Sequence, residues 1–297
     1  MKIFYGIQNN NIDITNICHD KLKINNRITI PHNDNIRASY FSDPLFGILK
    51  YIYLQLNDNI IHEFDENKTI VIDTDNDTFT IIDESHINDT INRLHSCLKL
   101  KHGSFNDELP EQKIVVRYLK GNEKVLEIGG NIGRNSLIIA SLLNNQKNLV
   151  VLESDYNIYK QLTENRNINN YNFFIENSAL SKKKLIQNHW NTIPSDVLRP
   201  NYKWVNIINW IQLYNKYNII FDTLVLDCEG AFYYILQDMP EILDNINLII
   251  MENDYWNINE KNYIDSILSK KNFIVDYQEP GGWGPCQSFF FQVWIKM

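Results

Sequence analysis

The chain has 297 residues, of which 44% are hydrophobic and 22% are charged, and its formal net charge is −8. These proportions are ordinary for a globular protein, and the acidic balance argues against a nucleic-acid partner, because phosphate binding needs a basic stripe. No apolar run approaches the roughly 20 residues of a membrane span, and residues 1–11 lack the apolar core of a signal peptide. We therefore expect no membrane partner and a cytoplasmic location, that of the host cell if the protein is viral.

Residues 1–100 are expected to form a small β-rich domain. Runs of strand-forming residues alternate with turns rich in Asn and Asp. The predicted strands are residues 2–7, 27–30, 48–54, 69–74 and 78–82. Residues 75–77 join the last two as a hairpin. No residue here indicates a chemical role, so we expect the domain to serve acceptor docking or self-association in a possible homo-oligomer.

Two helices are predicted between this domain and the rest of the chain. The first has Ser85 as its N-cap, carries apolar residues at helical spacing and ends near Gly103. The second spans about residues 110–120, with Pro110 at its start and Gly121 as its stop. The first helix is the natural connector to a second domain at residues 101–297.

Strand and helix patterns alternate through the second domain. Apolar strands are predicted at residues 125–128, 148–153, 172–176, 221–227, 248–252, 273–277 and 289–295, and helices at 134–143, 156–167 and 259–270. Residues 189–210 resist assignment. Alternation with buried strands predicts a parallel sheet that is covered by helices on both faces. The link at residues 280–285 predicts a closing hairpin that adds one antiparallel strand.

The first strand of this domain runs directly into a glycine-rich turn. Residues 124–136 read KVLEIGGNIGRNS, with Gly129, Gly130 and Gly133 between the strand and the next helix. Glycines at a helix N-terminus let the backbone approach a ligand closely. The turn lacks the G-x-G-x-x-G pattern of dinucleotide sites, and Glu127 would repel pyrophosphate. A ligand with an ammonium group and no phosphate is therefore favoured.

This segment resembles the first motif of class I S-adenosylmethionine-dependent methyltransferases. It is similar in particular to the FkbM type, whose turn ends in N-x-G-x-x-S, here Asn131, Gly133 and Ser136. The resemblance covers about residues 105–297. It implies an α/β fold with a Rossmann-like, seven-stranded methyltransferase sheet that is parallel except for one strand, and it implies S-adenosylmethionine as the cofactor.

Further residues become candidate cofactor ligands. Glu153 ends the second strand, 153 − 133 = 20 residues after the last glycine of the turn, where nucleotide-binding units place the acid that binds ribose hydroxyls. The resemblance implies that Glu127 balances the ammonium group and that Ser178 and Ala179 lie at the adenine. For Glu153 the alternative is a solvated strand end, and for the polar residues at the helix start it is simple helix capping. The remaining candidates lie in the turn, at the helix start and after the second strand: Asn131, Asn135, Ser136 and Ser154.

A second motif, LVLDCEGA at residues 224–231, resembles the family's K-I-D-x-E-G-A segment at the end of the fourth strand. The family's Lys is absent here. Ligands of open α/β sheets bind at strand carboxyl ends beside the switch in strand order. Asp227 and Glu229 are therefore the candidate catalytic acids, as a general base and its helper, as ligands of a divalent ion, or as partners of acceptor hydroxyls. For Glu229, capping of the next helix is the structural alternative.

The four cysteines offer no metal site. Cys18, Cys97, Cys228 and Cys286 are widely spaced and form no C-x-x-C pair, so neither a zinc site nor a redox dithiol is indicated. Free thiols are the expected state, and we assign no metal from the sequence.

Three residues are candidates for the acceptor side. Glu252 ends the fifth strand, and His189 and Trp190 lie where FkbM-like chains place an acceptor loop; such a pair suits a sugar or an aromatic group. We expect an O-methyltransferase that acts on a small-molecule or glycan acceptor, with a sugar hydroxyl favoured. The alternatives are a nucleotide-sugar or NAD-binding enzyme and a non-catalytic binding module on the same fold.

Overall fold

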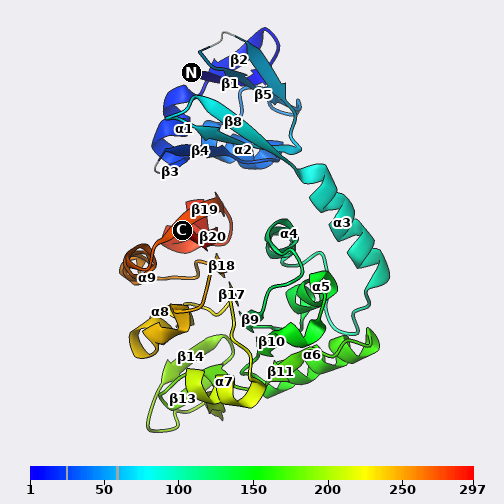
Figure 1. Cartoon of the computed structure of the whole chain (residues 1–297), viewed down its shortest axis with the longest axis vertical. Coiled ribbons are helices and arrows are strands. Elements are labelled where there is room, and N and C mark those ends of the chain that lie inside the picture. Colours follow the sequence, from blue (N-terminus) through cyan, green and yellow to red (C-terminus); the bar gives the residue numbers. More distant parts are fainter. Residues whose placement is uncertain (25, 58–59) are drawn as a thin grey trace. The chain divides into compact units, whose positions relative to one another are not determined.

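The computed structural model describes all residues except 25, 58 and 59. The described chain forms two compact units, Met1–Asp89 and Thr90–Met297 (Figure 1). The division falls inside helix α3 (Glu84–Cys97). Ile91 and Leu94, in the second half of this helix, pack into a core of the second unit. The contacts therefore divide the chain earlier than the domain boundary expected at residue 100.

The first unit contains two antiparallel sheets of four strands, in the orders β2-β1-β5-β6 and β3-β4-β7-β8. Their strands are β1 (Lys2–Ile7), β2 (Asn10–Asp13), β3 (Lys23–Ile24), β4 (Arg27–Ile30), β5 (Tyr51–Gln55), β6 (Ile61–Phe64), β7 (Lys68–Asp73) and β8 (Thr78–Asp83). The predicted hairpin is confirmed, since β7 and β8 pair with each other. Ile3, Ile28 and Ile70 belong to one buried core that both sheets share.

Two short helices of this unit escape prediction from the sequence, α1 (Thr15–Lys21) and α2 (Asp34–Phe41). The start of α2 is fixed by Asn33, whose side chain accepts two backbone N–H groups of the first turn. Arg37 in this helix is fully buried and donates to two backbone carbonyls at 2.8 Å. Such polar contacts leave no apolar period in the sequence.

The second unit is built on a seven-stranded sheet of order β11-β10-β9-β17-β18-β20-β19. Its strands are β9 (Val125–Ile128), β10 (Leu149–Leu152), β11 (Phe174–Glu176), β17 (Thr223–Leu226), β18 (Leu248–Glu252), β19 (Phe273–Glu279) and β20 (Phe291–Lys296). β20 runs antiparallel to β18 and β19, and all other neighbours in the sheet are parallel. The expected fold class, a Rossmann-like sheet of seven strands with one antiparallel strand, is confirmed.

Helices cover both faces of this sheet (Figure 1). One face carries α4 (Leu109–Tyr118), α5 (Arg134–Leu142) and α6 (Tyr156–Ile168), and the other carries α7 (Trp210–Tyr217), α8 (Ala231–Asp238) and α9 (Ile258–Lys270). Side chains alternate between the faces along a strand, so Val125 belongs to the first core and Leu126 to the second. Burial on both faces accounts for the unbroken apolar runs of the strands.

Short strands lie within and just before the region that the sequence leaves unassigned. β13 (Leu185–Asn188) pairs antiparallel with β14 (Asn191–Pro194) and β15 (Lys203–Val205), while β12 (Ala179–Leu180) and β16 (Ile207–Ile208) pair in parallel. These strands have two to four residues each, too few for a period to be visible. α7 then begins at a capping box of Asn209 and Gln212.

One predicted cap is wrong. Ser85 lies inside α3, and its backbone N–H donates to the carboxylate of Asp83 at 3.0 Å. Asp83, the residue directly before α3, thus takes the capping position.

The remaining helical segments are short 3₁₀ turns, η1 (Gln146–Asn148), η2 (Pro240–Leu243) and η3 (Gly284–Phe289). Among the described residues no helix has both the length and the apolar character needed to cross a membrane.

Candidate active site

The glycine turn joins β9 to α5. The amides of Gly129 and Gly130 both donate to the carbonyl oxygen of Leu152 at 3.0 Å, which ties the turn to the end of the neighbouring strand. The backbone is left-handed at Gly129, Asn131 and Gly133, with φ of 90°, 45° and 92°. α5 begins at Gly133 without a side-chain cap, so the capping alternative for the polar residues of the turn is not seen.

The three glycines are required by packing against other parts of the protein. A Cβ atom on Gly129 would lie 1.5 Å from the carbonyl oxygen of Asp227. On Gly130 it would lie 2.1 Å from a methyl group of Val151, and on Gly133 it would lie 2.3 Å from a methyl group of Leu162. The turn is therefore pressed against its neighbouring strands and α6, a different cause from the ligand approach that the sequence suggests.

Glu127 and Ser136 form a buried pair beneath the turn. Ser136 donates from Oγ to Glu127 Oε2 at 2.5 Å, and the two residues are 0% and 3% exposed, respectively. Burial raises the pKa of Glu127 to about 8, against the lowering effect of the serine hydrogen bond. Glu127 and Asn135 line a small void of about 10 Å³. These three predicted cofactor residues thus lie behind the turn.

Glu153 follows β10 and is 7% exposed. Its Oε2 accepts the amide N–H of Asn131 at 3.0 Å, and its Oε1 accepts that of Asp155 at 2.7 Å. Burial raises the pKa of Glu153 to about 7, and the two backbone hydrogen bonds act in the opposite direction. The residue is a buried carboxylate anchored to the glycine turn, so the alternative of a solvated strand end is not seen.

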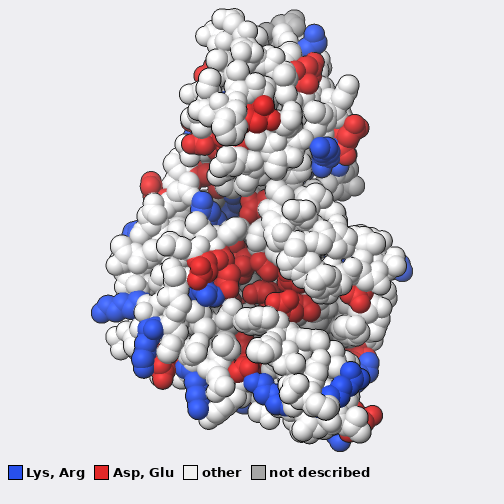
Figure 2. All heavy atoms as spheres, turned by 180° about the vertical axis from the view of Figure 1, so that it is seen from behind, with Lys and Arg blue, Asp and Glu red and all other residues white. Residues whose placement is uncertain are grey.

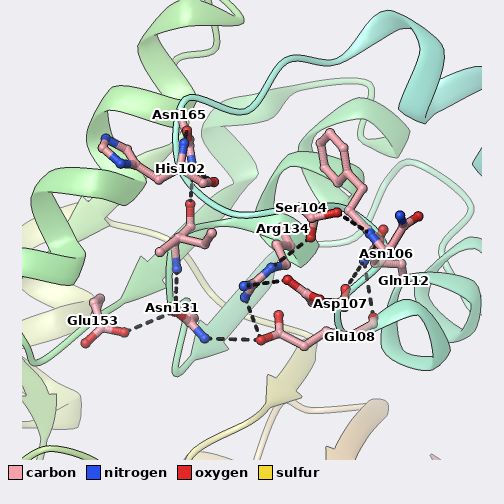
Figure 3. Close-up of polar contacts among 12 residues, drawn as sticks. His102, Ser104, Asn106, Asp107, Glu108, Gln112, Asn131, Arg134, Glu153 and Asn165 are labelled. Atoms are coloured by element: carbon pink, nitrogen blue, oxygen red, sulfur yellow. Dashed lines mark hydrogen bonds and ion pairs between the residues drawn. The ribbon is translucent and has the colours of Figure 1, made fainter.

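Arg134 ties the segment before α4 to the glycine turn (Figure 3). Its Nη1 donates to Glu108 Oε1 at 2.7 Å, and its Nε donates to the carbonyl oxygen of Ser104 at 3.1 Å. Glu108 Oε1 also accepts the side-chain amide of Asn131 at 3.1 Å. This network places residues 104–111 beside the turn.

A cavity of about 370 Å³ opens at the carboxyl ends of β9, β10, β17 and β18. Of the described residues that line it, eight are Asp or Glu and one is Lys, and Figure 2 shows acidic side chains gathered in a hollow of the surface. The single lysine, Lys183, forms an ion pair with Asp238 at 2.9 Å. Such a site repels phosphate and favours ligands that carry positive charge.

Three carboxylates from separate elements meet in this cavity. Glu111 comes from the first turn of α4, Asp227 follows β17, and Glu252 ends β18. One oxygen of each lies within 4.8 Å of the other two. Asp254, which is 7% exposed, lines the same cavity, and its Oδ2 has no hydrogen-bond partner.

Burial and mutual repulsion raise the pKa of these carboxyl groups. Burial is the largest cause in each case, and the charge of Glu252 is the next for Glu111, Asp227 and Asp254. The pKa of Asp254 rises to about 8, and those of Glu111 and Asp227 lie well above the ordinary range. Asp254 therefore holds a proton at neutral pH in the absence of a cation, and the raised pKa of the others shows that burial and repulsion disfavour their charged forms.

Glu229 also lines the cavity, from a residue with φ of 50°. Burial raises its pKa. α8 begins at Gly230 without a side-chain cap, so the capping role considered for Glu229 is not seen.

Ser154, Ser178 and Ala179 line the cavity as well. Gln187 of β13 donates from Nε2 to Ser154 Oγ at 3.0 Å, while its Oε1 is buried without a hydrogen-bond partner. Because buried acceptors are almost always paired, this oxygen fits a ligand that donates an N–H group.

Aromatic side chains lie at the cavity too. Trp190, Tyr234 and Trp283 line it, and the ring of Trp283 lies 4.2 Å from that of Trp256, between centroids. His189 is exposed at the turn between β13 and β14 and is not among the described lining residues. Faces of this kind bind sugar rings and other flat groups.

The sequence analysis missed Glu108, Glu111, Gln187 and Asp254. Glu108 and Glu111 lie on either side of a predicted helix start, where acidic residues are usually explained by helix capping. Gln187 lies just before the region without predicted elements, so no pattern indicated a role for it. Asp254 had a usable signal, since it follows Glu252 by two residues at the carboxyl end of a predicted strand.

No protein-family model matches the chain, and no curated protein sequence matches it. Similar solved structures include an O-methyltransferase from Bacillus cereus in complex with SAH, at 14% identity, with 72% of this chain and 92% of that chain covered and a TM-score of 0.41. A methyltransferase from Pyrococcus furiosus shows 13% identity, 71% and 98% coverage and a TM-score of 0.38. A ribosomal protein L11 methylase from Lactobacillus delbrueckii subsp. bulgaricus shows 12% identity, with 67% of this chain and 82% of that chain covered and a TM-score of 0.42. At these TM-scores the fold assignment rests on the strand order of the sheet itself.

Proposed function

We propose that this chain is an S-adenosylmethionine-dependent methyltransferase of the FkbM type that acts on an acceptor hydroxyl. The observation that carries the proposal is the buried carboxylate of Glu153, held by the Asn131 amide of the glycine turn at 3.0 Å. In this strand order the ligand crevice lies where the order reverses, between β9 and β17. Glu153 and Asp227, which follow strands on either side of that point, line one cavity.

The residues on the cofactor side fit S-adenosylmethionine. Glu153 keeps lone pairs beyond its two backbone hydrogen bonds, so it can accept from ribose hydroxyls. The unpaired Oε1 of Gln187 can accept from the amino group of adenine. The excess of carboxylates suits a ligand with sulfonium and ammonium groups, and it disfavours the phosphates of NAD and nucleotide sugars.

S-adenosylmethionine supplies an electrophilic methyl group, and alignment of the acceptor is the main task of the chain's own residues. Asp227, beside the glycine turn, can orient the acceptor hydroxyl and take its proton as the new carbon–oxygen bond forms. Trp190 and Trp283 offer flat apolar faces at the same cavity. They support a sugar hydroxyl, free or in a glycan, as the acceptor.

Titration calorimetry of the full chain with SAH, NAD and UDP-glucose tests the cofactor. We expect heat with SAH alone, and we expect Glu153→Ala to weaken SAH binding by about 1–3 kcal/mol, since ribose hydroxyls lose their buried partner. Binding of NAD without binding of SAH would sink the assignment. Mass spectrometry of a panel of sugars and glycans after incubation with S-adenosylmethionine then tests the acceptor.

A further inference from the structure

We infer that Glu111, Asp227 and Glu252 form a binding site for one divalent cation such as Mg²⁺ or Mn²⁺. One carboxylate oxygen of each lies within 4.8 Å of the other two. Two oxygens bound to one ion lie at most twice the bond length apart, which is about 5 Å for Ca²⁺ and about 4.2 Å for Mg²⁺. The separation of the three oxygens therefore allows one ion of the size of Ca²⁺ to contact all of them, and small side-chain rotations would bring them onto a smaller Mg²⁺ or Mn²⁺ ion.

The three ligands come from elements whose positions are fixed by the core. Glu252 ends β18 and Asp227 follows β17, two strands that pair in parallel through four residues each. Glu111 is 7% exposed in the first turn of α4, whose apolar side packs on the sheet through Ile114 and Val115. A site on rigid elements of this kind binds an ion without a large ordering cost.

Asp254 is an independent sign of a missing partner. This side chain is more than nine-tenths buried, lines the cavity beside Glu252, and leaves Oδ2 without a hydrogen-bond partner. A buried, unpaired carboxylate oxygen is costly. A cation with its bound water supplies both the charge and the donor that this oxygen lacks.

The protein itself supplies no compensating charge to this group. Within the part of the chain that the structure describes, no Lys, Arg or His lies at ion-pair distance from Glu111, Asp227, Glu252 or Asp254. The nearby Arg134 is already paired with Asp107 and Glu108. Four carboxylates in one cavity repel one another strongly at low dielectric, and a divalent ion removes most of that repulsion.

The donor set selects the class of ion. All the donors are carboxylate oxygens, with no His or Cys among them, and such sets suit Mg²⁺, Mn²⁺ and Ca²⁺ rather than Zn²⁺ or Cu²⁺. Under the proposed function, on which this step rests, the ion would hold the acceptor's hydroxyl oxygen within reach of the methyl group. Asp227 would then act as an ion ligand and orient the acceptor hydroxyl through the ion, in place of taking its proton.

Electron paramagnetic resonance of Mn²⁺ added to the full chain, without cofactor or acceptor, tests the site. We expect one bound Mn²⁺ per chain, displaced by Mg²⁺. Glu111→Gln and Glu252→Gln should each weaken Mn²⁺ binding at least tenfold. Asp238→Asn is the matched control, because it removes a carboxylate that lines the same cavity but pairs with Lys183, and it should change the affinity less than about twofold, as expected for an independent site.

The outcomes separate this inference from the proposed function. Mn²⁺ binding that is absent in the wild type, or that weakens equally in Glu111→Gln and Asp238→Asn, would overturn the site. Tight binding of methylammonium with no binding of Mn²⁺ would also overturn it, in favour of an ammonium-bearing acceptor. SAH calorimetry on the same variants shows whether each is folded, and SAH binding without Mn²⁺ binding leaves the transferase proposal standing while the ion site fails.

Discussion

Glu153 should make cofactor affinity depend on pH in a narrow window. With its pKa raised to about 7, the carboxyl group is about one-tenth ionised at pH 6 and about nine-tenths ionised at pH 8. Only the ionised form keeps the amides of Asn131 and Asp155 bound and still offers free lone pairs on both oxygens to ribose hydroxyls. SAH should therefore bind more tightly as pH rises, and its dissociation constant should fall about tenfold from pH 6 to pH 8.

The same shift acts in the opposite sense on the unliganded fold. The pKa of Glu153 is raised from 4.5, so the stability that the protonated group contributes is complete below about pH 4.5 and is lost as the pH rises towards 7. A ligand that prefers the ionised form recovers this loss. The stabilisation of the protein by SAH should accordingly grow with pH.

Calorimetry with SAH at half-unit steps from pH 5.5 to pH 8.5, on the wild type and Glu153→Gln, measures the effect. The amide variant cannot ionise, so its affinity should be flat across the window and weaker than the wild type at pH 8 by about 1–3 kcal/mol. A wild-type dissociation constant that is unchanged between pH 6 and pH 8 would refute the reasoning. A variant that keeps the wild-type slope would assign the titration to another group, such as Asp254.

Four further outcomes follow from the site and the fold. Asp227→Asn should keep SAH affinity and lower turnover by about 10²–10⁴-fold, as measured with the acceptor identified by mass spectrometry; a normal rate would remove Asp227 from the mechanism. Gly129→Ala should unfold at a much lower temperature than Gly47→Ala, because its Cβ would lie 1.5 Å from a carbonyl oxygen, whereas that of Gly47 would meet nothing within 4 Å. In the wild type, the pKa of about 8 for Glu127 should make the free energy of unfolding fall by about 3 kcal/mol between pH 4.5 and pH 7, and Glu127→Gln should abolish this fall. Free energies of unfolding from chemical denaturation that change equally with pH in the two proteins would contradict this. A fragment of residues 84–297, which keeps α3 whole, should bind SAH with the affinity of the full chain, and loss of binding would mean that the first unit is needed.

The positions of the strands along the chain were predictable from local patterns, whereas their arrangement in one seven-stranded sheet was expected from the family resemblance. Buried parallel strands are short, apolar and end in polar residues, so the runs that end at Ile128 and Leu226 could be recognised one by one. The rule that ligands bind where strand order reverses then placed the site beside them. Glu153 was predicted from its spacing to the glycine turn, and in the structure it is buried and lines the cavity.

The parts that could not be predicted depend on contacts between distant segments. Glu111 reaches Asp227 and Glu252 only because α4 packs on the sheet, and nothing in the residues around it carries that information. Gln187 lies on a strand of four residues, too short for a period. The glycines were recognised for a reason that differs from the one the structure gives, because a sequence shows that a side chain is missing but not which neighbour fills the space.

The contact between Gly129 and the carbonyl oxygen of Asp227 also constrains how this protein can diverge. The two residues are 227 − 129 = 98 positions apart in the sequence, yet their backbones pack so closely that no side chain fits between them. Related chains should therefore keep glycine at this place whatever acceptor they use, while the exposed turn between β13 and β14, at His189 and Trp190, is free to change length and composition. Evolution of a new acceptor specificity should proceed through that turn, with the strand ends inherited as a unit.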